Sequence, residues 1–293
     1  MKTALVTGAC GLLGQYLVNH LKSKYKTVAV DIAANVFETH KNVAFVNRDL
    51  TESGAPAGIL SEANPDIIYN CAAYTDVDGC ETDRDRAYEL NVKLVENLLD
   101  AGPKRLIQYS TDHVFNGERG PYKEDDETDP IGYYGETKLQ SERITLNSAG
   151  RHLIIRTNVL FGSGINIRPN FVTWLMDNLR QSNRIKVVTD QYNNPIHADN
   201  LAGASIEAEE SGLTGVLHLA GDSYLSRFEL AVETADFFNF DRNLILPVKS
   251  SELEQIAGRP LRGGLKIDLA KRLLESRLLG FDEALGLMKI PTA

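Results

Sequence analysis

Apolar positions in the first half of the chain follow two alternating periods. Short continuous apolar runs are separated by stretches in which apolar residues recur every three or four positions, as at Leu13, Leu17 and Leu21. The runs predict strands and the stretches predict helices: strands at 3–7, 27–30, 43–46, 67–69, 105–109 and 152–155, and helices at about 87–98 and 134–147. Strands that alternate with helices predict a parallel sheet covered by helices on both faces.

The pattern loosens after about residue 158. The periods there predict helices at about 170–181, 200–210 and 227–240, another helix from 268, and strands at 185–188 and 216–219. We see no repeat, low-complexity segment or linker between the halves. We therefore predict a first domain at residues 1–158, to which residues 185–222 return, and a smaller, interwoven lobe at residues 159–293.

Composition narrows the function classes. The 293 residues hold 31 Lys and Arg against 40 Asp and Glu, a net charge of −9, which opposes nucleic-acid binding because that function needs a basic face. No apolar run approaches the ~18 residues of a membrane span, and the first residues lack the longer apolar stretch and the cleavage site expected of a secretory signal. Three cysteines form no even framework, so a reducing cytoplasm is expected. The six histidines show no paired spacing, so no metal site is expected.

A glycine-rich turn lies between the first predicted strand and helix. Gly8-Ala9-Cys10-Gly11-Leu12-Leu13-Gly14 has the G-x-x-G-x-x-G spacing. Gly8 permits a tight turn, Gly11 lets the backbone approach a pyrophosphate, and Gly14 lets the helix pack against the strand. The pyrophosphate would bind at the helix N-terminus, where free N–H groups and the positive dipole end lie. The chain therefore predicts a Rossmann-type doubly wound α/β fold that binds a dinucleotide.

Asp31 bears on the choice of cofactor. It ends the second predicted strand, 17 residues after Gly14, where a carboxylate can accept hydrogen bonds from the adenosine ribose. A 2′-phosphate there would face a like charge at a cost of roughly 1–4 kcal/mol. The following residues, 32–35, contain no Lys or Arg to offset that cost. We therefore expect NAD(H) to be favoured over NADP(H).

Other loops are expected to leave the same edge of the sheet, where ligands bind in such folds. Asp49 and Leu50 follow the third strand, and the small residues Cys71, Ala72 and Ala73 follow the fourth. The candidate cofactor-binding residues are Gly8, Cys10, Gly11, Leu12, Leu13, Gly14, Asp31, Asp49, Leu50, Cys71, Ala72, Ala73, Asn91, Tyr134 and Lys138.

Tyr134 and Lys138 are the candidate catalytic pair, together with Thr111. They are spaced i and i+4 on one face of a predicted helix, and the preceding strand ends in Ser110-Thr111-Asp112. A lysine cation about 4 Å away would favour the phenolate by roughly 4 kcal/mol at an effective dielectric of about 20. That is a fall of about three pKa units, which would bring the pKa of Tyr134 from about 10 to near 7. A hydroxyl from Thr111 could hold the oxygen of a carbonyl substrate while Tyr134 moves the proton.

Together these features resemble the extended short-chain dehydrogenase/reductase superfamily, and within it the dTDP-4-dehydrorhamnose reductase family. The resemblance implies reduction of a 4-keto group on a nucleotide-linked 6-deoxysugar with an NAD(P)H cofactor, with Thr111, Tyr134 and Lys138 as the catalytic residues. The stretches that carry it, in chain order, are 110–117, 121–125 with Pro130, 134–138, 156–162, Asp190-Gln191 with Pro195, and 259–268.

Three departures from the family pattern fall where the sugar or the nucleotide would bind. His113 stands where the family usually has Tyr. After Gln191, the chain reads Tyr-Asn-Asn-Pro where the family usually has Gly-x-Pro-Thr, and Arg262-Gly263-Gly264 departs from the family motif that follows Arg259-Pro260. Arg156, Arg168 and Arg259 are candidates to clamp a pyrophosphate because the arginine fork suits that group. The candidate substrate-binding residues are Thr75, Asp112, His113, Val114, Asn158, His197 and Arg259.

Two other functions stay open. An epimerase or 4,6-dehydratase could use the same scaffold, although a dehydratase typically has Glu after the Thr-Asp pair, where this chain has His113. A non-catalytic regulatory subunit is the other alternative, because the methionine adenosyltransferase β-subunit has this fold and similar motifs. The expected ligand is a nucleotide sugar, with no nucleic acid or membrane partner, and the chain could form a homodimer.

Overall fold

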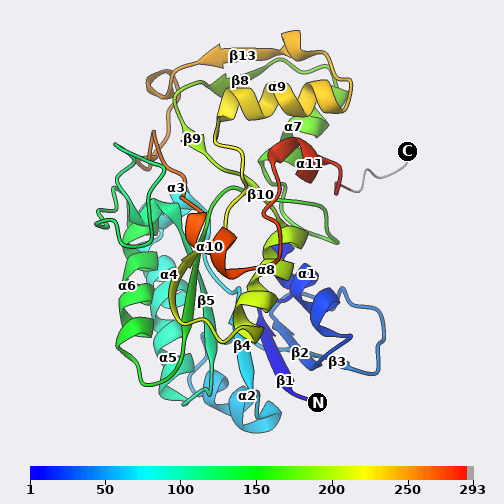
Figure 1. The fold of residues 1–293 in the computed structure, drawn as a ribbon, viewed down its shortest axis with the longest axis vertical. Coiled ribbons are helices and arrows are strands. Elements are labelled where there is room, and N and C mark those ends of the chain that lie inside the picture. The colour runs from blue at the N-terminus through cyan, green and yellow to red at the C-terminus, as the bar shows by residue number, and fades with distance from the viewer. Residues whose placement is uncertain (289–293) are drawn as a thin grey trace.

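A seven-stranded parallel sheet forms the centre of the larger part of the protein (Figure 1). The structure is a computed structural model that describes residues 1–288. The strand order is β11-β6-β5-β4-β1-β2-β3, and every neighbouring pair is parallel. The strands are β1 (Thr3–Thr7), β2 (Lys26–Asp31), β3 (Val43–Asn47), β4 (Ile67–Asn70), β5 (Leu106–Thr111), β6 (Leu153–Thr157) and β11 (Gly215–His218). This arrangement confirms the predicted doubly wound Rossmann-type fold.

Helices cover both faces of the sheet because alternate strand residues point to opposite sides. Val6 and Ile107 share one apolar cluster with α1 (Leu12–Leu21) and α8 (Ala198–Glu210). Their chain neighbours Leu5 and Leu106 share another cluster with α2 (Ala55–Ala63) and α5 (Leu94–Asp100). The strands are therefore buried on both faces, which explains why they read as continuous apolar runs.

The helix predicted at residues 87–98 is interrupted. It consists of α4 (Arg84–Tyr88), a π-helical turn η1 (Glu89–Lys93) and α5, with the short helix α3 (Val77–Thr82) before it. α6 (Tyr133–Asn147) packs against α5 and β5 and matches the predicted helix at 134–147. The π-helical turn places Asn91 where it is 1% exposed and faces the loop after β4.

The smaller lobe lies at one end of the sheet (Figure 1). In it β8 (Ile185–Val188) pairs with β13 (Ile245–Val248), and α7 (Phe171–Arg180) and α9 (Arg227–Phe237) share an apolar cluster with these strands. Within residues 185–222, β11 joins the large sheet whereas β8 belongs to the lobe. The division at residue 158 stays a prediction. The helix predicted at 227–240 ends at Phe237, and Asn239 adopts a left-handed φ of 56°.

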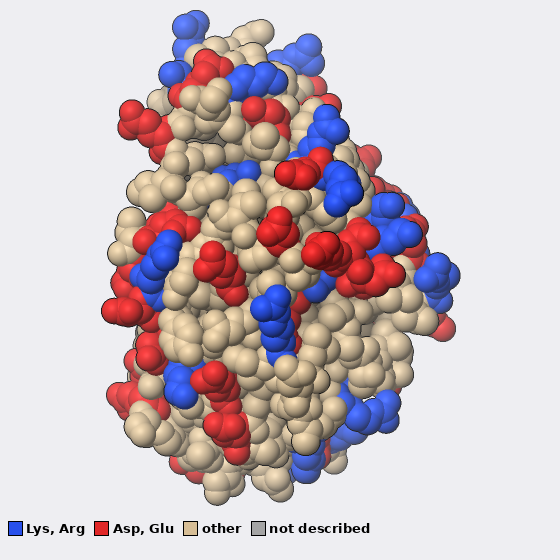
Figure 2. All heavy atoms as spheres, turned by 90° about the vertical axis from the view of Figure 1, so that its left-hand side faces the viewer, with Lys and Arg blue, Asp and Glu red and all other residues tan. Residues whose placement is uncertain are grey.

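Short strand pairs and two further helices join the lobe to the sheet. β7 (Leu160–Phe161) pairs with β10 (Ile196–His197), and β9 (Tyr192–Asn193) pairs with β12 (Leu225–Ser226). The C-terminal segment adds α10 (Asp268–Leu273) and α11 (Phe281–Leu285). None of the described helices is long and apolar enough to cross a membrane. On the face that carries α6, acidic and basic side chains are interspersed rather than gathered into one basic patch (Figure 2).

Candidate active site

The glycine turn between β1 and α1 needs its glycines. Gly8 adopts a left-handed φ of 59°, and a Cβ on it would lie 2.7 Å from the backbone N of Ala72. A Cβ on Gly14 would clash with the carbonyl oxygen of Gly8. Gly11 is the N-cap of α1 and provides no side-chain cap, so the first N–H groups of the helix are available to a phosphate. The turn has the close backbone approaches that a dinucleotide site requires.

Asp31 lies beside this turn, at the end of β2. Its carboxylate accepts hydrogen bonds from the backbone N of Cys10 at 2.8 Å and of Ala33 at 2.9 Å. An adjoining hollow of about 460 Å³ is lined by Ile32, Asn47, Arg48, Asp49 and Glu52. Leu50, a candidate cofactor contact, instead packs its side chain into the core.

The loop after β4 forms the opposite wall of the turn. The backbone N of Cys71 donates to the carbonyl oxygen of Thr7 at 3.2 Å, and that of Ala72 donates to Thr7 Oγ1 at 3.3 Å. Asn91 is a candidate cofactor contact, and its side-chain amide binds the backbone of Tyr74. Asn91 Oδ1 accepts from the Tyr74 backbone N at 2.8 Å, and Asn91 Nδ2 donates to the Tyr74 carbonyl oxygen at 3.0 Å. Asn91 therefore holds this loop in place. Thr75, a candidate substrate contact, is exposed on the same loop.

Thr111, Tyr134 and Lys138 are brought together by β5 and α6. The side chain of Thr111 acts on the pKa of Tyr134, so the two side chains are neighbours, and the Thr111 hydroxyl donates to Asp112 Oδ1 at 3.3 Å. Thr111 Oγ1 also accepts from the backbone N of His113 at 3.2 Å. Lys138, one helical turn beyond Tyr134, is 3% exposed. The hydroxyl groups of Thr111 and Tyr134 can therefore bind one substrate oxygen together, next to a buried cation.

The electrostatics of Tyr134 differ from the sequence-based expectation. Burial raises the pKa of Tyr134 above its usual value, and the neighbouring Thr111 side chain opposes this only in part. Burial also lowers the pKa of Lys138 to about 8. The expectation that Lys138 brings the pKa of Tyr134 near 7 is wrong for this structure, because it counted the attraction of one cation and not the desolvation of the phenolate.

Asp112 and Asn158 connect this site to the C-terminal half. Asp112 Oδ2 accepts from the backbone N of Gly264 at 3.0 Å and from Asn158 Nδ2 at 3.4 Å. Asn158 Nδ2 also donates to Asn194 Oδ1 at 2.9 Å. The ring of His113 packs edge-to-face on Tyr134 with the centroids 5.5 Å apart, and burial lowers the pKa of His113. Val114 is fully buried in the core.

Comparison with known proteins decides the family. The RmlD substrate binding domain family matches residues 1–289 of the chain. This protein belongs to that family. The predicted resemblance to the dTDP-4-dehydrorhamnose reductases, within an extended short-chain dehydrogenase/reductase fold, is thereby confirmed.

Individual relatives agree with the family match. The dTDP-4-dehydrorhamnose reductase of Aggregatibacter actinomycetemcomitans is 30% identical over 248 residues, which cover 80% of this chain and 79% of that protein. A solved dTDP-4-dehydrorhamnose reductase of Bacillus anthracis, in complex with NADP, superposes with a TM-score of 0.86 at 28% identity and covers 97% of each chain. The methionine adenosyltransferase 2 subunit beta of Xenopus tropicalis is 28% identical over 279 residues, 92% of this chain and 81% of that protein.

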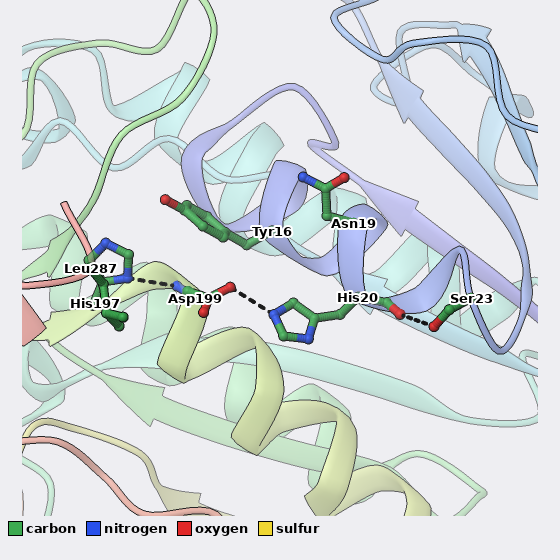
Figure 3. A pocket seen from close by; sticks show the side chains of 7 residues that line it. All are labelled: Tyr16, Asn19, His20, Ser23, His197, Asp199 and Leu287. Carbon is green, nitrogen blue, oxygen red and sulfur yellow. Dashed lines mark hydrogen bonds and ion pairs between the residues drawn. The ribbon is translucent and has the colours of Figure 1, made fainter. Parts of the chain in front are cut away.

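His197 lies in a different hollow from the catalytic candidates of this RmlD-family chain. It lines a cavity of about 540 Å³ with Tyr16, Asn19, His20, Ser23, Asp199 and Leu287, between α1 and α8 (Figure 3). Its Nδ1 accepts from the backbone N of Asp199 at 3.2 Å, which caps α8, and its ring packs between those of Tyr16 and Phe161. Burial lowers the pKa of His197 to about 4, so it is neutral at pH 7. These contacts give His197 a structural role in this part of the family fold.

The three arginines that are candidates to clamp a pyrophosphate all form ion pairs within the protein. Arg156 forms a buried ion pair with Glu142 at 2.7 Å and is therefore unavailable to a pyrophosphate. Arg168 pairs with Asp76 at 3.3 Å and is largely exposed, and Arg259 pairs with Asp78 at 3.0 Å.

Arg227 was missed by sequence reasoning. It begins α9, its guanidinium lies over the Phe171 ring with the Cζ 5.0 Å from the centroid, and burial lowers its pKa to about 10. Asp112 and Arg259 both act on that pKa, so Arg227 lies near the substrate candidates. The only sequence feature that marked Arg227 was its position at the start of a predicted helix, directly after Ser226.

Proposed function

We propose that this protein is an NAD(P)H-dependent reductase of a nucleotide-linked 4-keto-6-deoxysugar. The observation that carries the proposal is that Thr111 and Tyr134 are neighbours beside the buried Lys138, in a chain of the RmlD family with a dinucleotide-type glycine turn. When bound, the nicotinamide cofactor supplies the hydride. Thr111 binds the keto oxygen, Tyr134 donates its phenolic proton to that oxygen, and Lys138 stabilises the phenolate that remains.

The raised pKa of Tyr134 suits this direction of proton transfer. A phenol whose pKa lies above its usual value is fully protonated at pH 7 and is available as a general acid. Hydride addition to the keto carbon would leave an alkoxide on the keto oxygen, which is a far stronger base than a phenolate, so the proton moves toward the product. The nearby Lys138 cation then limits the cost of the buried phenolate.

NADH is proposed as the favoured cofactor. Three carboxylates support this preference: Asp31 lies at the turn, where the adenosine ribose is expected, and Asp49 and Glu52 line the adjoining hollow. Arg48, which also lines the hollow, is engaged by Glu62 at 3.1 Å. A 2′-phosphate there would be repelled by the carboxylates and would have to compete with Glu62 for Arg48. This preference differs from the NADP seen in the B. anthracis relative.

The substrate is proposed to bind between the end of β5 and the start of α9. Arg227 and Arg259 supply positive charge near Asp112 and His113, which suits the diphosphate of a nucleotide sugar. Asp112 and Asn158, whose side chains are already hydrogen-bonded to the C-terminal half, would hold the site together. A direct contact with Thr75 stays a prediction, as do the cytoplasmic location and the homodimer.

A regulatory subunit is the second candidate, favoured by the similarity to the methionine adenosyltransferase 2 subunit beta. An epimerase or dehydratase on the same scaffold is the third. Tight NAD(H) binding without turnover, together with copurification of a partner enzyme, would support the regulatory function. NAD that copurifies and is regenerated during turnover would support the epimerase.

The deciding experiment follows NADH oxidation at 340 nm with a panel of nucleotide-linked 4-keto-6-deoxysugars, with NADPH in parallel. Oxidation with at least one sugar, abolished in Tyr134→Phe, is the expected result. Tyr133→Phe is a matched control, because Tyr133 precedes Tyr134 on α6 and its ring packs on the Arg84 guanidinium. If no sugar is reduced although NADH binds, the reductase proposal fails.

A further inference from the structure

A buried charged network lies directly behind the catalytic pair on α6. Tyr134, Lys138 and Glu142 are spaced at successive intervals of four residues, so their side chains follow one another along one face of the helix. Lys138 is 3% exposed and Glu142 is 1% exposed. The lysine therefore lies between the proton donor on one side and a buried carboxylate on the other.

Glu142 is held rigidly by the two strands that carry the active site. Arg156 on β6 binds the Glu142 carboxylate in a bidentate manner: Nε donates to Oε1 at 2.9 Å and Nη2 donates to Oε2 at 2.7 Å. Ser110 on β5, the residue before Thr111, donates a short hydrogen bond to the same carboxylate. The remaining Nη1 of Arg156 is occupied by the carbonyl oxygen of Glu124 at 3.2 Å. The orientation of Glu142 is thus fixed with respect to Thr111 and to α6.

The groups that face Lys138 differ in charge. Those that act on its pKa are Glu142 on its own helix, Cys71 in the loop after β4, and Cys80 on α3, and Tyr134 lies one helical turn before it. Burial raises the pKa of both thiols and that of the Tyr134 phenol, so all three groups are neutral near pH 7. Glu142 is therefore the anion that acts on the Lys138 ammonium, which burial otherwise drives toward the neutral amine.

We propose that Glu142, oriented by Arg156 and Ser110, is a positioning residue whose buried negative charge keeps Lys138 protonated next to Tyr134. This inference rests on the proposed function for its catalytic meaning, because only a protonated Lys138 can stabilise the Tyr134 phenolate. The charge relation between Glu142 and Lys138 can be tested without any substrate.

The test is an NMR titration of lysine-labelled protein, in which the Cε resonance of Lys138 is identified by its loss in Lys138→Met. In the wild type the resonance should titrate at about pH 8. Two charges that are neighbours on a helix, partly offset by Arg156, should couple by about one pH unit. In Glu142→Gln the midpoint should fall by about that amount, whereas Glu142→Asp, which keeps the charge, should restore most of it.

Two further variants protect the test against misfolding. Glu142→Gln leaves Arg156 buried without its partner, so Glu142→Gln/Arg156→Gln removes both charges in a more stable protein. Its Lys138 midpoint should also fall below that of the wild type, but by less than in Glu142→Gln, because the Arg156 cation no longer repels Lys138. Glu136→Gln is the matched control, because Glu136 is an exposed acid on the same helix and its loss should leave the midpoint unchanged.

A second readout connects the charge to turnover. The alkaline limb of kcat/KM for sugar reduction should move to lower pH in each variant by the amount that the Lys138 midpoint falls in that variant. An unchanged Lys138 midpoint in both variants overturns the inference. Failure of the wild type to reduce any keto-sugar would overturn the proposed function instead and would leave the NMR result intact.

Discussion

Removal of the Asp31 charge tests the cofactor proposal most directly. The carboxylate accepts from the backbone N of Cys10 and Ala33, so its position beside the glycine turn is fixed. Asp31→Asn keeps the shape of the side chain, removes its charge and leaves one accepting oxygen in place of two. We expect NADPH to bind more tightly to the variant and NADH to bind less tightly.

The expected change in cofactor affinity has two contributions, one for NADPH and one for NADH. At a separation of about 5 Å, a carboxylate and each unit of phosphate charge repel by ~1 kcal/mol in a water-like dielectric and by ~3 kcal/mol at a dielectric of about 20. An intermediate ~2 kcal/mol corresponds to about 30-fold tighter NADPH binding in the variant. Loss of a hydrogen bond from the ribose to a charged acceptor should weaken NADH binding by about 1.5 kcal/mol, or roughly tenfold.

The assay is a fluorescence titration of both cofactors at low ionic strength, with the ratio of the two Kd values as the readout. Glu52→Gln is the matched control, since it removes one carboxylate from the same hollow at an exposed position and should change the ratio by less than about threefold. Equal weakening of both cofactors in Asp31→Asn would refute the electrostatic reasoning. Wild-type protein that binds NADPH as tightly as NADH would refute the proposed preference itself.

Three other substitutions have clear expected outcomes. Tyr134→Phe should lower kcat by about 10²- to 10⁴-fold while the Kd for NADH stays unchanged; a parallel loss of NADH affinity would contradict its role as proton donor. Gly8→Ala should lower the free energy of unfolding by about 1–3 kcal/mol in urea and abolish NADH binding, because it adds a Cβ at a left-handed φ against Ala72. Gly54→Ala, also at positive φ but in open space, should bind NADH normally. Arg227→Gln should raise KM for the sugar at least tenfold with NADH affinity unchanged, if a charge-assisted contact of about 1.5 kcal/mol is lost; an unchanged KM would remove Arg227 from the substrate site.

The strands of the sheet could be predicted because both of their faces are buried, which makes each one a continuous apolar run. The helices were harder where they carry little apolar surface. α2 buries only Pro56, Ile59 and Leu60, and it begins after Gly54, so its pattern is too short to recognise. α3 buries only Cys80. The π-helical turn was invisible because one extra residue in a helical turn barely alters the spacing of apolar positions.

The candidate site divides in the same way between local and long-range features. The glycine turn and the Tyr134–Lys138 pair are contiguous motifs, and the structure places both at the same edge of the sheet. The hydrogen bond between Asp112 and Gly264 joins residues that are 152 positions apart in the sequence, and no local pattern in either segment predicts it. Arg156 was assigned to a pyrophosphate because its partner, Glu142, lies on a different element. Long-range pairing therefore decided which charged residues are free to bind ligands.

Burial also explains why the pKa of the catalytic pair could not be derived from spacing. An i, i+4 spacing predicts that Tyr134 and Lys138 are neighbours, but the sequence does not give the solvation of either group. In the structure, desolvation moves both pKa values toward the neutral forms, upward for Tyr134 and downward for Lys138. The Tyr134 phenol is neutral and can donate a proton, and the charge of Lys138 depends on the buried Glu142 carboxylate. Such a site is suited to reduction rather than oxidation. We therefore propose that the charge of Glu142 contributes to catalysis. Without it, the burial that keeps Tyr134 protonated would lower the pKa of Lys138 further. Less of the Lys138 ammonium would then be left to stabilise the Tyr134 phenolate.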